Sequence, residues 1–188
     1  MRIRITPGAV LLLAVMAYAR SALLLATVLC VAVHESGHLL AARVMRIPLR
    51  LLELDLPGAK ILPAGLLPSY TSEWVLAASG PVASVLLFGL CAPLGTPFFT
   101  KVAAISLCLG LFNLLPICDF DGGRILHALT AAVFGDHTAR SVLSASSYLC
   151  LLLLFSISAC LLLRYGQNMT LAVLCASLFA RLFLLGQR

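Results

Sequence analysis

Long apolar runs dominate this sequence and restrict what the chain can fold into. A helix that crosses a bilayer needs about 20 mostly apolar residues, so each such run is a potential membrane span. The runs that we identify cover residues 5–19, 21–45, 74–93, 98–117, 142–163 and 168–186. The sequence therefore predicts an all-α membrane protein with about six transmembrane helices and a multi-pass position in a cell membrane.

The composition supports the same conclusion and excludes other classes of protein. Of the 188 residues, 62% are apolar and 11% are charged, whereas soluble domains carry about 25% charged residues. So few charges cannot cover a globule with a hydrated surface. This excludes an ordinary soluble domain, a disordered chain and a nucleic-acid-binding protein built on basic patches. No internal repeat or low-complexity linker divides the sequence, so we expect a single domain over residues 1–188 in contact with the lipid bilayer.

The first run leaves the number of spans open between five and six. Residues 5–19 are short for a span, and only Arg20 separates them from the next run. One long helix across residues 8–32 is the alternative, and it would leave five spans. A cleaved secretory signal peptide is a further alternative, because two arginines precede an apolar run that ends in Ala17-Tyr18-Ala19.

Basic residues indicate the orientation, because cytosolic loops carry an excess of Lys and Arg. With six spans and a cytosolic N-terminus, only Arg20, Lys101 and Arg164 of the 13 basic residues fall on the outer side. The others lie inside or at the inner boundary: Arg2, Arg4, Arg43, Arg46, Arg50, Lys60, Arg124, Arg140, Arg181 and Arg188. This distribution predicts that both termini lie on the cytosolic side.

The connection over residues 47–72 is more than a simple loop. It contains four prolines, and leucine alternates with charge from Leu52 to Leu56 before a Pro57-Gly58 turn. Such alternation on either side of a turn is typical of a β-hairpin. We therefore expect a hairpin that lies at the membrane surface or re-enters the membrane. An interfacial loop without strands is the alternative.

An HExxH pattern, His34-Glu35-Ser36-Gly37-His38, stands within the second apolar run. On a helix, residues i and i+4 lie on nearly the same side, so both imidazoles can bind one cation. The spacing suits zinc, with Glu35 beside the metal as general base. Ionisable residues within a membrane span are costly to bury, so their presence indicates a function. The alternative is a helix end with polar side chains that reach the cytosolic surface, but His38 lies about 10 Å from that end, which is deep for an imidazole.

A second polar cluster follows the fourth run, over residues 113–124. Pro116 cannot continue a regular helix, and Gly122-Gly123 let the backbone turn tightly. A catalytic zinc needs a third protein ligand and an open position for water. With six spans this cluster and His38 both lie toward the cytosolic face, so we expect the third ligand in or near the cluster. The available side chains are Cys118, Asp119, Asp121, His127, Asp136 and His137.

Two motifs, in this order and at this separation, resemble the site-2 protease family of intramembrane zinc metalloproteases, peptidase family M50. They are HESGH and Asn-x-x-Pro-x-x-x-x-Asp-Gly, the latter formed by Asn113, Pro116, Asp121 and Gly122. The resemblance covers about residues 20–130, which would be the catalytic core. The compact form of the chain resembles the stage IV sporulation protease branch of that family.

The resemblance implies a role for each matching residue. His34, His38 and Asp121 would be the ligands of one zinc ion per chain, and Glu35 would be the general base. Asn113 would orient the substrate or stabilise the oxyanion. The active site would open to the cytosolic side.

The sequence departs from the family pattern at several positions. Cys118 stands where a proline is common, and we expect it to be a small buried hydrophobe rather than a soft ligand. Asp119 is unexpected; residues two apart share a side in an extended stretch, so either Asp119 or Asp121 could reach the metal. We favour Asp121 because it directly precedes the glycine turn. Ser84 stands where an asparagine is frequent. Ala78-Ser79-Gly80-Pro81 resembles the family's Gly-Pro element, which we interpret as a kink with close packing.

Three further polar residues after the motif have simpler interpretations. We expect His127 to be interfacial rather than a metal ligand, and His137 to lie in a solvated loop with Gly135 and Asp136. Arg124 would anchor the chain at the cytosolic interface.

The resemblance implies hydrolysis of a peptide bond in or near the transmembrane segment of a membrane-spanning protein substrate. A membrane-tethered transcription-factor precursor, such as a sigma factor, is the substrate class that the sporulation branch suggests. A divalent-metal transporter and a non-catalytic metal-binding membrane subunit are the alternatives that would use the same side chains. Both a regulatory membrane partner and a homo-oligomer are compatible with the sequence.

Overall fold

The computed structural model describes residues 2–5, 22–47, 49–55, 58–63, 69–118, 120–165, 175–176 and 178–179. The chain forms two compact units, residues 1–114 and 115–188. The expected span at 5–19 lies outside the described residues except for its first residue, and the span at 168–186 does so except for four residues.

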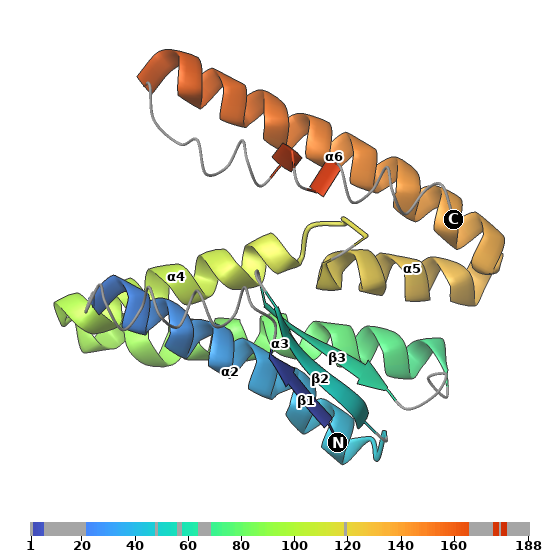
Figure 1. The fold of residues 1–188 in the computed structure, drawn as a ribbon, viewed down its shortest axis with the longest axis horizontal. Coiled ribbons are helices and arrows are strands. Elements are labelled where there is room, and N and C mark those ends of the chain that lie inside the picture. The colour runs from blue at the N-terminus through green and yellow to red at the C-terminus, as the bar shows by residue number, and fades with distance from the viewer. Residues whose placement is uncertain are drawn as a thin grey trace. The chain divides into compact units, whose positions relative to one another are not determined.

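The first unit is built on three helices that pack against one another (Figure 1). Ser69 precedes the helix over Tyr70–Cys91 as its cap. Its hydroxyl accepts the Ser72 backbone N–H and so satisfies one of the backbone donors that a helix start leaves without a partner. Thr96 caps the helix over Pro97–Asn113 in the same way, because its hydroxyl accepts the Phe99 backbone N–H. The helices are α2 (Ala22–Val44), α3 (Tyr70–Cys91) and α4 (Pro97–Asn113), with a short 3₁₀ helix η1 (Ala92–Leu94) after α3.

The same unit contains a small sheet of three strands in the order β1-β2-β3 (Figure 1). The strands are β1 (Arg2–Ile5), β2 (Leu49–Asp55) and β3 (Gly58–Pro63). β2 and β3 pair antiparallel across the connection expected to form a hairpin, with Glu53 opposite Lys60. β1 pairs parallel with β2, with Arg2 opposite Leu51, although the sequence gave no indication of a strand at the N-terminus.

One stripe of α2 is buried along the whole helix. The buried residues recur every fourth position, which places them on one side of a helix. They are Ala26, Cys30, His34, His38 and Ala42. The other buried positions besides the two histidines are small, and small residues let helix backbones approach closely in a membrane. Gly37 confirms the close approach, because a Cβ there would lie 2.5 Å from the Ser79 carbonyl oxygen of α3.

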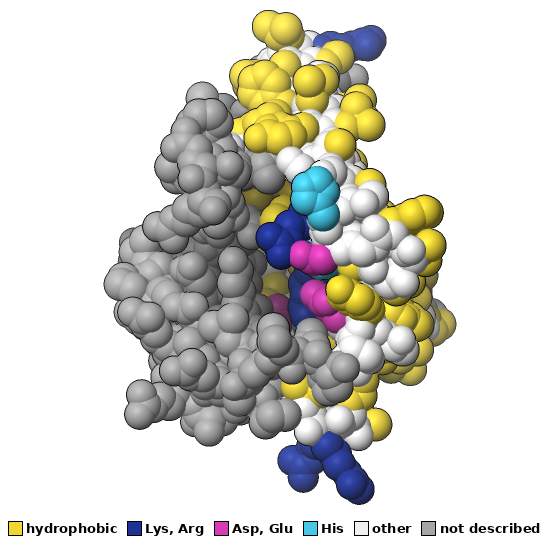
Figure 2. All heavy atoms as spheres, turned by 90° about the vertical axis from the view of Figure 1, so that its right-hand side faces the viewer, with side chains coloured by type: hydrophobic (Ala, Val, Ile, Leu, Met, Phe, Trp, Pro, Cys, Tyr) yellow, Lys and Arg dark blue, Asp and Glu magenta, His cyan; other side chains and the backbone are white. Residues whose placement is uncertain are grey.

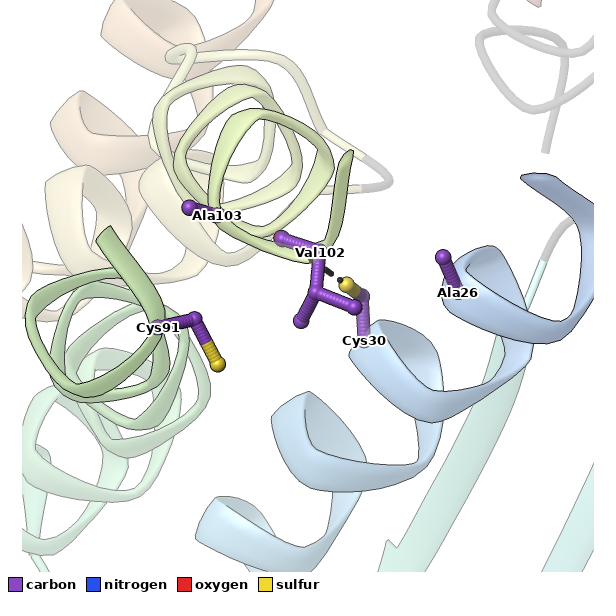
Figure 3. Packing of buried hydrophobic residues seen from close by; sticks show 5 residues of the cluster. All are labelled: Ala26, Cys30, Cys91, Val102 and Ala103. Atoms are coloured by element: carbon purple, nitrogen blue, oxygen red, sulfur yellow. Dashed lines mark hydrogen bonds between the residues drawn. The ribbon is translucent and has the colours of Figure 1, made fainter. Parts of the chain in front are cut away.

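An apolar cluster fills one part of the interface between these three helices (Figure 3). It consists of Ala26 and Cys30 from α2, Cys91 from α3, and Val102 and Ala103 from α4. The Cys30 thiol also donates a hydrogen bond of 3.3 Å to the Val102 carbonyl oxygen.

The second unit contains α5 (Asp121–Phe134) and α6 (Asp136–Tyr165), which pack against each other. They are joined at Gly135, whose φ of +81° belongs to a region that side chains disfavour. Two serines of α6 form hydrogen bonds with the segment before α5. The Ser147 hydroxyl accepts the Cys118 backbone N–H, and the Ser146 hydroxyl donates to the Pro116 carbonyl oxygen.

Within the described residues, three helices are long and apolar enough to cross a membrane. They are Ala22–Val44, Tyr70–Leu94 and Asp136–Arg164. α4 is shorter, because it ends at Asn113 instead of continuing to residue 117 as expected; a residue before proline disfavours the helical conformation, and Pro116 follows closely. Hydrophobic side chains cover much of the described surface in Figure 2, as expected for helices that contact lipid. The chain is a membrane protein.

Candidate metal centre

The two histidines of the HExxH pattern lie side by side near the middle of α2. Their ring centroids are 5.1 Å apart, and both side chains are buried. Glu35 lies between them in sequence and is half-buried. The i, i+4 spacing therefore has the consequence that the sequence predicts, since one face of one helix presents both imidazoles.

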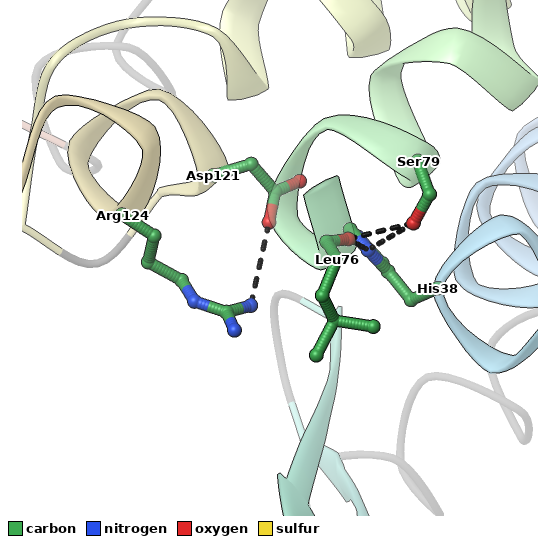
Figure 4. A network of polar contacts seen from close by, with 5 residues as sticks. All are labelled: His38, Leu76, Ser79, Asp121 and Arg124. Carbon is green, nitrogen blue, oxygen red and sulfur yellow. Dashed lines mark hydrogen bonds and ion pairs between the residues drawn. The ribbon is translucent and has the colours of Figure 1, made fainter. Parts of the chain in front are cut away.

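His38 is held by the backbone of α3 (Figure 4). Its Nδ1 lies 2.8 Å from the Leu76 carbonyl oxygen and 3.3 Å from the Ser79 hydroxyl oxygen. The Ser79 hydroxyl donates to the same Leu76 carbonyl oxygen at 2.6 Å. A carbonyl oxygen only accepts hydrogen bonds, so Nδ1 of His38 carries the proton and Nε2 presents its lone pair. This is the tautomer that a metal ligand needs when it binds through Nε2.

His34 is held by a side chain of α3. Its Nδ1 lies 2.9 Å from the Ser84 hydroxyl oxygen, and Ser84 is fully buried. The Ser84 carbonyl oxygen in turn accepts the Ser106 hydroxyl of α4 at 2.7 Å. Ser84, which stands where an asparagine is frequent in the family, thus contacts His34 in this structure.

Both Nε2 atoms lie beside Gly80 of α3. A Cβ on Gly80 would lie 2.2 Å from Nε2 of His38 and 2.8 Å from Nε2 of His34. No side chain other than hydrogen fits at that position. The interpretation of the Gly80-Pro81 element as close packing is therefore correct but incomplete, because what packs against Gly80 is the pair of imidazole rings.

Asn113 is the last residue of α4 and is half-buried. Its side-chain Nδ2 donates a hydrogen bond of 3.0 Å to the Leu109 carbonyl oxygen one turn earlier. An amide nitrogen carries two hydrogens and its oxygen accepts, so this contact occupies part of the hydrogen-bonding capacity of the side chain.

Asp121 is the first residue of α5 in the second unit and is buried. A carboxylate in the first turn of a helix is favoured by the helix dipole. Its Oδ1 lies 3.9 Å from Nη1 of Arg124 (Figure 4). Gly123 allows the tight turn before the helix, because a Cβ there would lie 2.0 Å from the Ile117 carbonyl oxygen. Gly122 and Gly123 themselves lie in the first turn of α5 rather than in a turn of their own.

The structure corrects two expectations about the other polar residues. Cys118 is exposed rather than buried, whereas Ile117 beside it is buried. His137 is not in a loop but in the first turn of α6. Asp136 begins that helix and pairs with Arg140 and, at 3.2 Å, with Nε2 of His127. Asp119 lies outside the described residues.

The comparisons with known proteins point to one family. Residues 79–157 match the model of Peptidase family M50. This segment is similar to peptidase family M50. The M50 segment contains Gly80, Ser84, Asn113 and Asp121, and the HExxH pattern precedes it. The resemblance that the two motifs predict is confirmed.

Two individual proteins are similar to this chain over more than the M50 segment. A Synechocystis protein named "Putative zinc metalloprotease" is 31% identical over 128 residues, which are 62% of this chain and 33% of that protein. This chain therefore spans about one third of the length of that relative. The Site-2 Protease from Methanocaldococcus jannaschii is similar in structure, with a TM-score of 0.71 over 94% of this chain and 87% of that one. At 20% identity this likeness shows a shared fold.

The sequence predicts both histidines as metal ligands, but it does not indicate the groups on α3 that orient their rings. Leu76 acts through its carbonyl oxygen, which every residue possesses, so no residue type could have indicated it. Ser79 and Gly80 belong to the element that the sequence pattern suggests is a kink with close packing, a prediction that assigns them no contact with the histidines. Their contacts with α2 depend on how two helices meet, which local sequence patterns do not encode.

Proposed function

We propose that this protein is an intramembrane zinc metalloprotease that hydrolyses a peptide bond in or near the transmembrane segment of a membrane-tethered substrate. One observation carries the proposal: Nε2 of His34 and Nε2 of His38 face the same space beside Gly80. Each Nδ1 is hydrogen-bonded to α3, so both rings are already oriented to bind one ion. The match of residues 79–157 to the Peptidase family M50 model supports peptide-bond hydrolysis as the reaction.

The residues present fit one zinc ion per chain. His34, His38 and Asp121 each offer one ligand atom, two imidazole nitrogens and a carboxylate oxygen, and catalytic zinc sites use three such protein ligands. Buried imidazoles that donate Nδ1–H to a fixed acceptor are the usual support of such a site. Bound zinc would polarise the scissile carbonyl and lower the pKa of a water to about 7.

Glu35 and Asn113 would perform the remaining chemistry. Glu35 adjoins His34 on α2; it would take a proton from the attacking water and later pass it to the leaving amine nitrogen. Asn113 would orient the substrate or stabilise the oxyanion through the N–H that the Leu109 carbonyl oxygen does not occupy. The substrate helix hides its amides in internal hydrogen bonds, so it must unwind locally before attack.

The placement in the membrane is part of the proposal. The distribution of basic residues supports six spans, with both termini and the site opening on the cytosolic side. The β2–β3 pair would lie at the membrane surface or re-enter it, and a strand edge there could pair with an unwound substrate. A membrane-tethered sigma-factor precursor is the proposed substrate class, and a regulatory membrane partner or a second copy of the chain would act at the same membrane.

The test uses purified full-length protein in vesicles, with single-span proteins as substrates. We expect cleavage that stops when a chelator removes the metal and returns when stoichiometric zinc is added. Vesicles loaded with a zinc-sensitive dye measure metal transport in the same preparation. Zinc flux without cleavage of any single-span substrate would contradict the proposal in favour of a transporter. Zinc binding with neither activity would favour a non-catalytic subunit.

A further inference from the structure

The two histidines are oriented by different kinds of partner. Nδ1 of His38 contacts the Leu76 carbonyl oxygen, a backbone group that is present whatever residue stands there. Nδ1 of His34 contacts the Ser84 hydroxyl, which a single substitution removes. The His38 ring is therefore held by a backbone group that no substitution removes, with the Ser79 hydroxyl beside it, whereas the Nδ1 contact of the His34 ring is made by a side chain.

Ser84 is itself fixed from a second helix. It is completely buried, and its carbonyl oxygen accepts the hydroxyl of the equally buried Ser106 at 2.7 Å. Gly110 of α4 packs against it, since a Cβ on Gly110 would lie 3.1 Å from the Ser84 Cβ. A hydroxyl in such a place has few alternative rotamers, so it presents its oxygen at one position.

We infer that Ser84 is a positioning residue for His34, with Ser106 of α4 holding Ser84 in place. This inference rests on the proposed zinc site and adds a residue that acts on it without contacting the ion. In the tautomer that binds metal through Nε2, Nδ1–H of His34 donates to the Ser84 oxygen. The contact keeps the ring turned toward Gly80 and raises the basicity of Nε2. Zinc affinity, rather than folding alone, thus depends on the Ser84 hydroxyl.

The test measures zinc affinity of full-length protein in detergent, by competition with a chromophoric chelator. Groups that orient a metal-binding histidine typically change affinity by about 10–100-fold when removed. We expect a loss of that size for Ser84→Ala and an affinity close to wild type for Ser84→Thr, which keeps the hydroxyl. Ser106→Ala should lower the affinity by less than Ser84→Ala, because it leaves the His34 contact in place.

Ser158→Ala is the matched control. Ser158 is as buried as Ser84, but its hydroxyl makes no hydrogen bond within the described part of the chain. Removing it should leave zinc affinity unchanged. Thermal unfolding of the metal-free variants separates a structural role from a positioning role, since a merely structural serine would lower Tm and leave affinity unchanged in the folded protein.

The outcomes distinguish this inference from the proposed function. Wild-type protein that binds no zinc would overturn the proposed site itself. Wild-type binding with equal affinity in Ser84→Ala would overturn only the role of Ser84. If Ser84→Ala does not fold, the visible spectrum of cobalt-loaded Ser106→Ala decides: a spectrum and affinity identical to wild type would contradict the inference.

Discussion

The buried stripe of α2 passes through two regions that are packed by different means. At Ala26 and Cys30 the side chains packed from α3 and α4 are apolar or thiol, and the Cys30 thiol makes one hydrogen bond, to the Val102 carbonyl oxygen (Figure 3). Further along the helix, His38 contacts the Leu76 carbonyl oxygen and the Ser79 hydroxyl (Figure 4). His34 contacts the Ser84 hydroxyl, and both rings lie beside Gly80.

The difference shows how the membrane interior tolerates polar groups in this protein. A buried polar group is costly unless it is hydrogen-bonded, and the Nδ1 atom of each histidine is. Their Nε2 atoms lie beside Gly80, where a Cβ would clash with them. The apolar region gives stability through packing, whereas in the polar region packing holds two imidazole nitrogens close to one place, as the proposed zinc site requires.

The largest effect is expected from Gly80→Ala. The added Cβ would lie 2.2 Å from Nε2 of His38, so at least one imidazole must turn away and the zinc site should be lost. Alanine is a better helix former than glycine by about 1 kcal/mol, so α3 should persist. Zinc content after dialysis and the circular dichroism spectrum test both points.

Gly89→Ala is the matched control on the same helix. A Cβ on Gly89 would meet nothing within 4 Å, so zinc content should match wild type. Equal zinc content in Gly80→Ala and Gly89→Ala would mean that the space beside Gly80 is not the metal site.

The next effect concerns the third ligand. We expect Asp121→Ala to weaken zinc binding by more than about 100-fold, beyond the 10–100-fold range of groups that only orient a ligand. Asp119→Ala should keep zinc, because Asp121 begins α5 directly before the glycine turn. Zinc lost from Asp119→Ala and retained by Asp121→Ala would reverse the assignment.

The smallest effect is expected in the apolar region and concerns stability alone. Val102→Ala removes two methyl groups from a fully buried position and should cost ~2 kcal/mol of unfolding free energy, measured as a lower Tm. Zinc affinity should stay within about twofold of wild type. Val133→Ala, at a largely exposed valine of α5, should change neither quantity. A parallel fall in affinity and stability for Val102→Ala would show that the two regions are not separable.

Sequence patterns could predict the parts of this structure that depend on local periodicity. The apolar runs gave α2, α3 and α6 their approximate positions, and the i, i+4 spacing placed His34 and His38 on one face. The close approach of another backbone to the Gly122-Gly123 pair is present at Gly123, where a Cβ would lie 2.0 Å from the Ile117 carbonyl oxygen.

The remaining features depend on how helices meet. That Ser84 would lie opposite His34, 50 residues away, follows from the packing of α2 on α3, for which no single residue is diagnostic. His137 and Asp136 were expected in a loop because they are polar, but they begin α6, where an acidic residue favours the first turn.

The most direct test of the central claim compares wild type with Glu35→Gln in one preparation. Zinc content and cleavage of a co-expressed single-span substrate are measured on the same protein. Glutamine keeps the size of the side chain but accepts no proton at neutral pH, so we expect full zinc content and no cleavage. Cleavage at the wild-type rate by zinc-loaded Glu35→Gln would contradict the assignment of Glu35 as the base and with it the proposed protease mechanism.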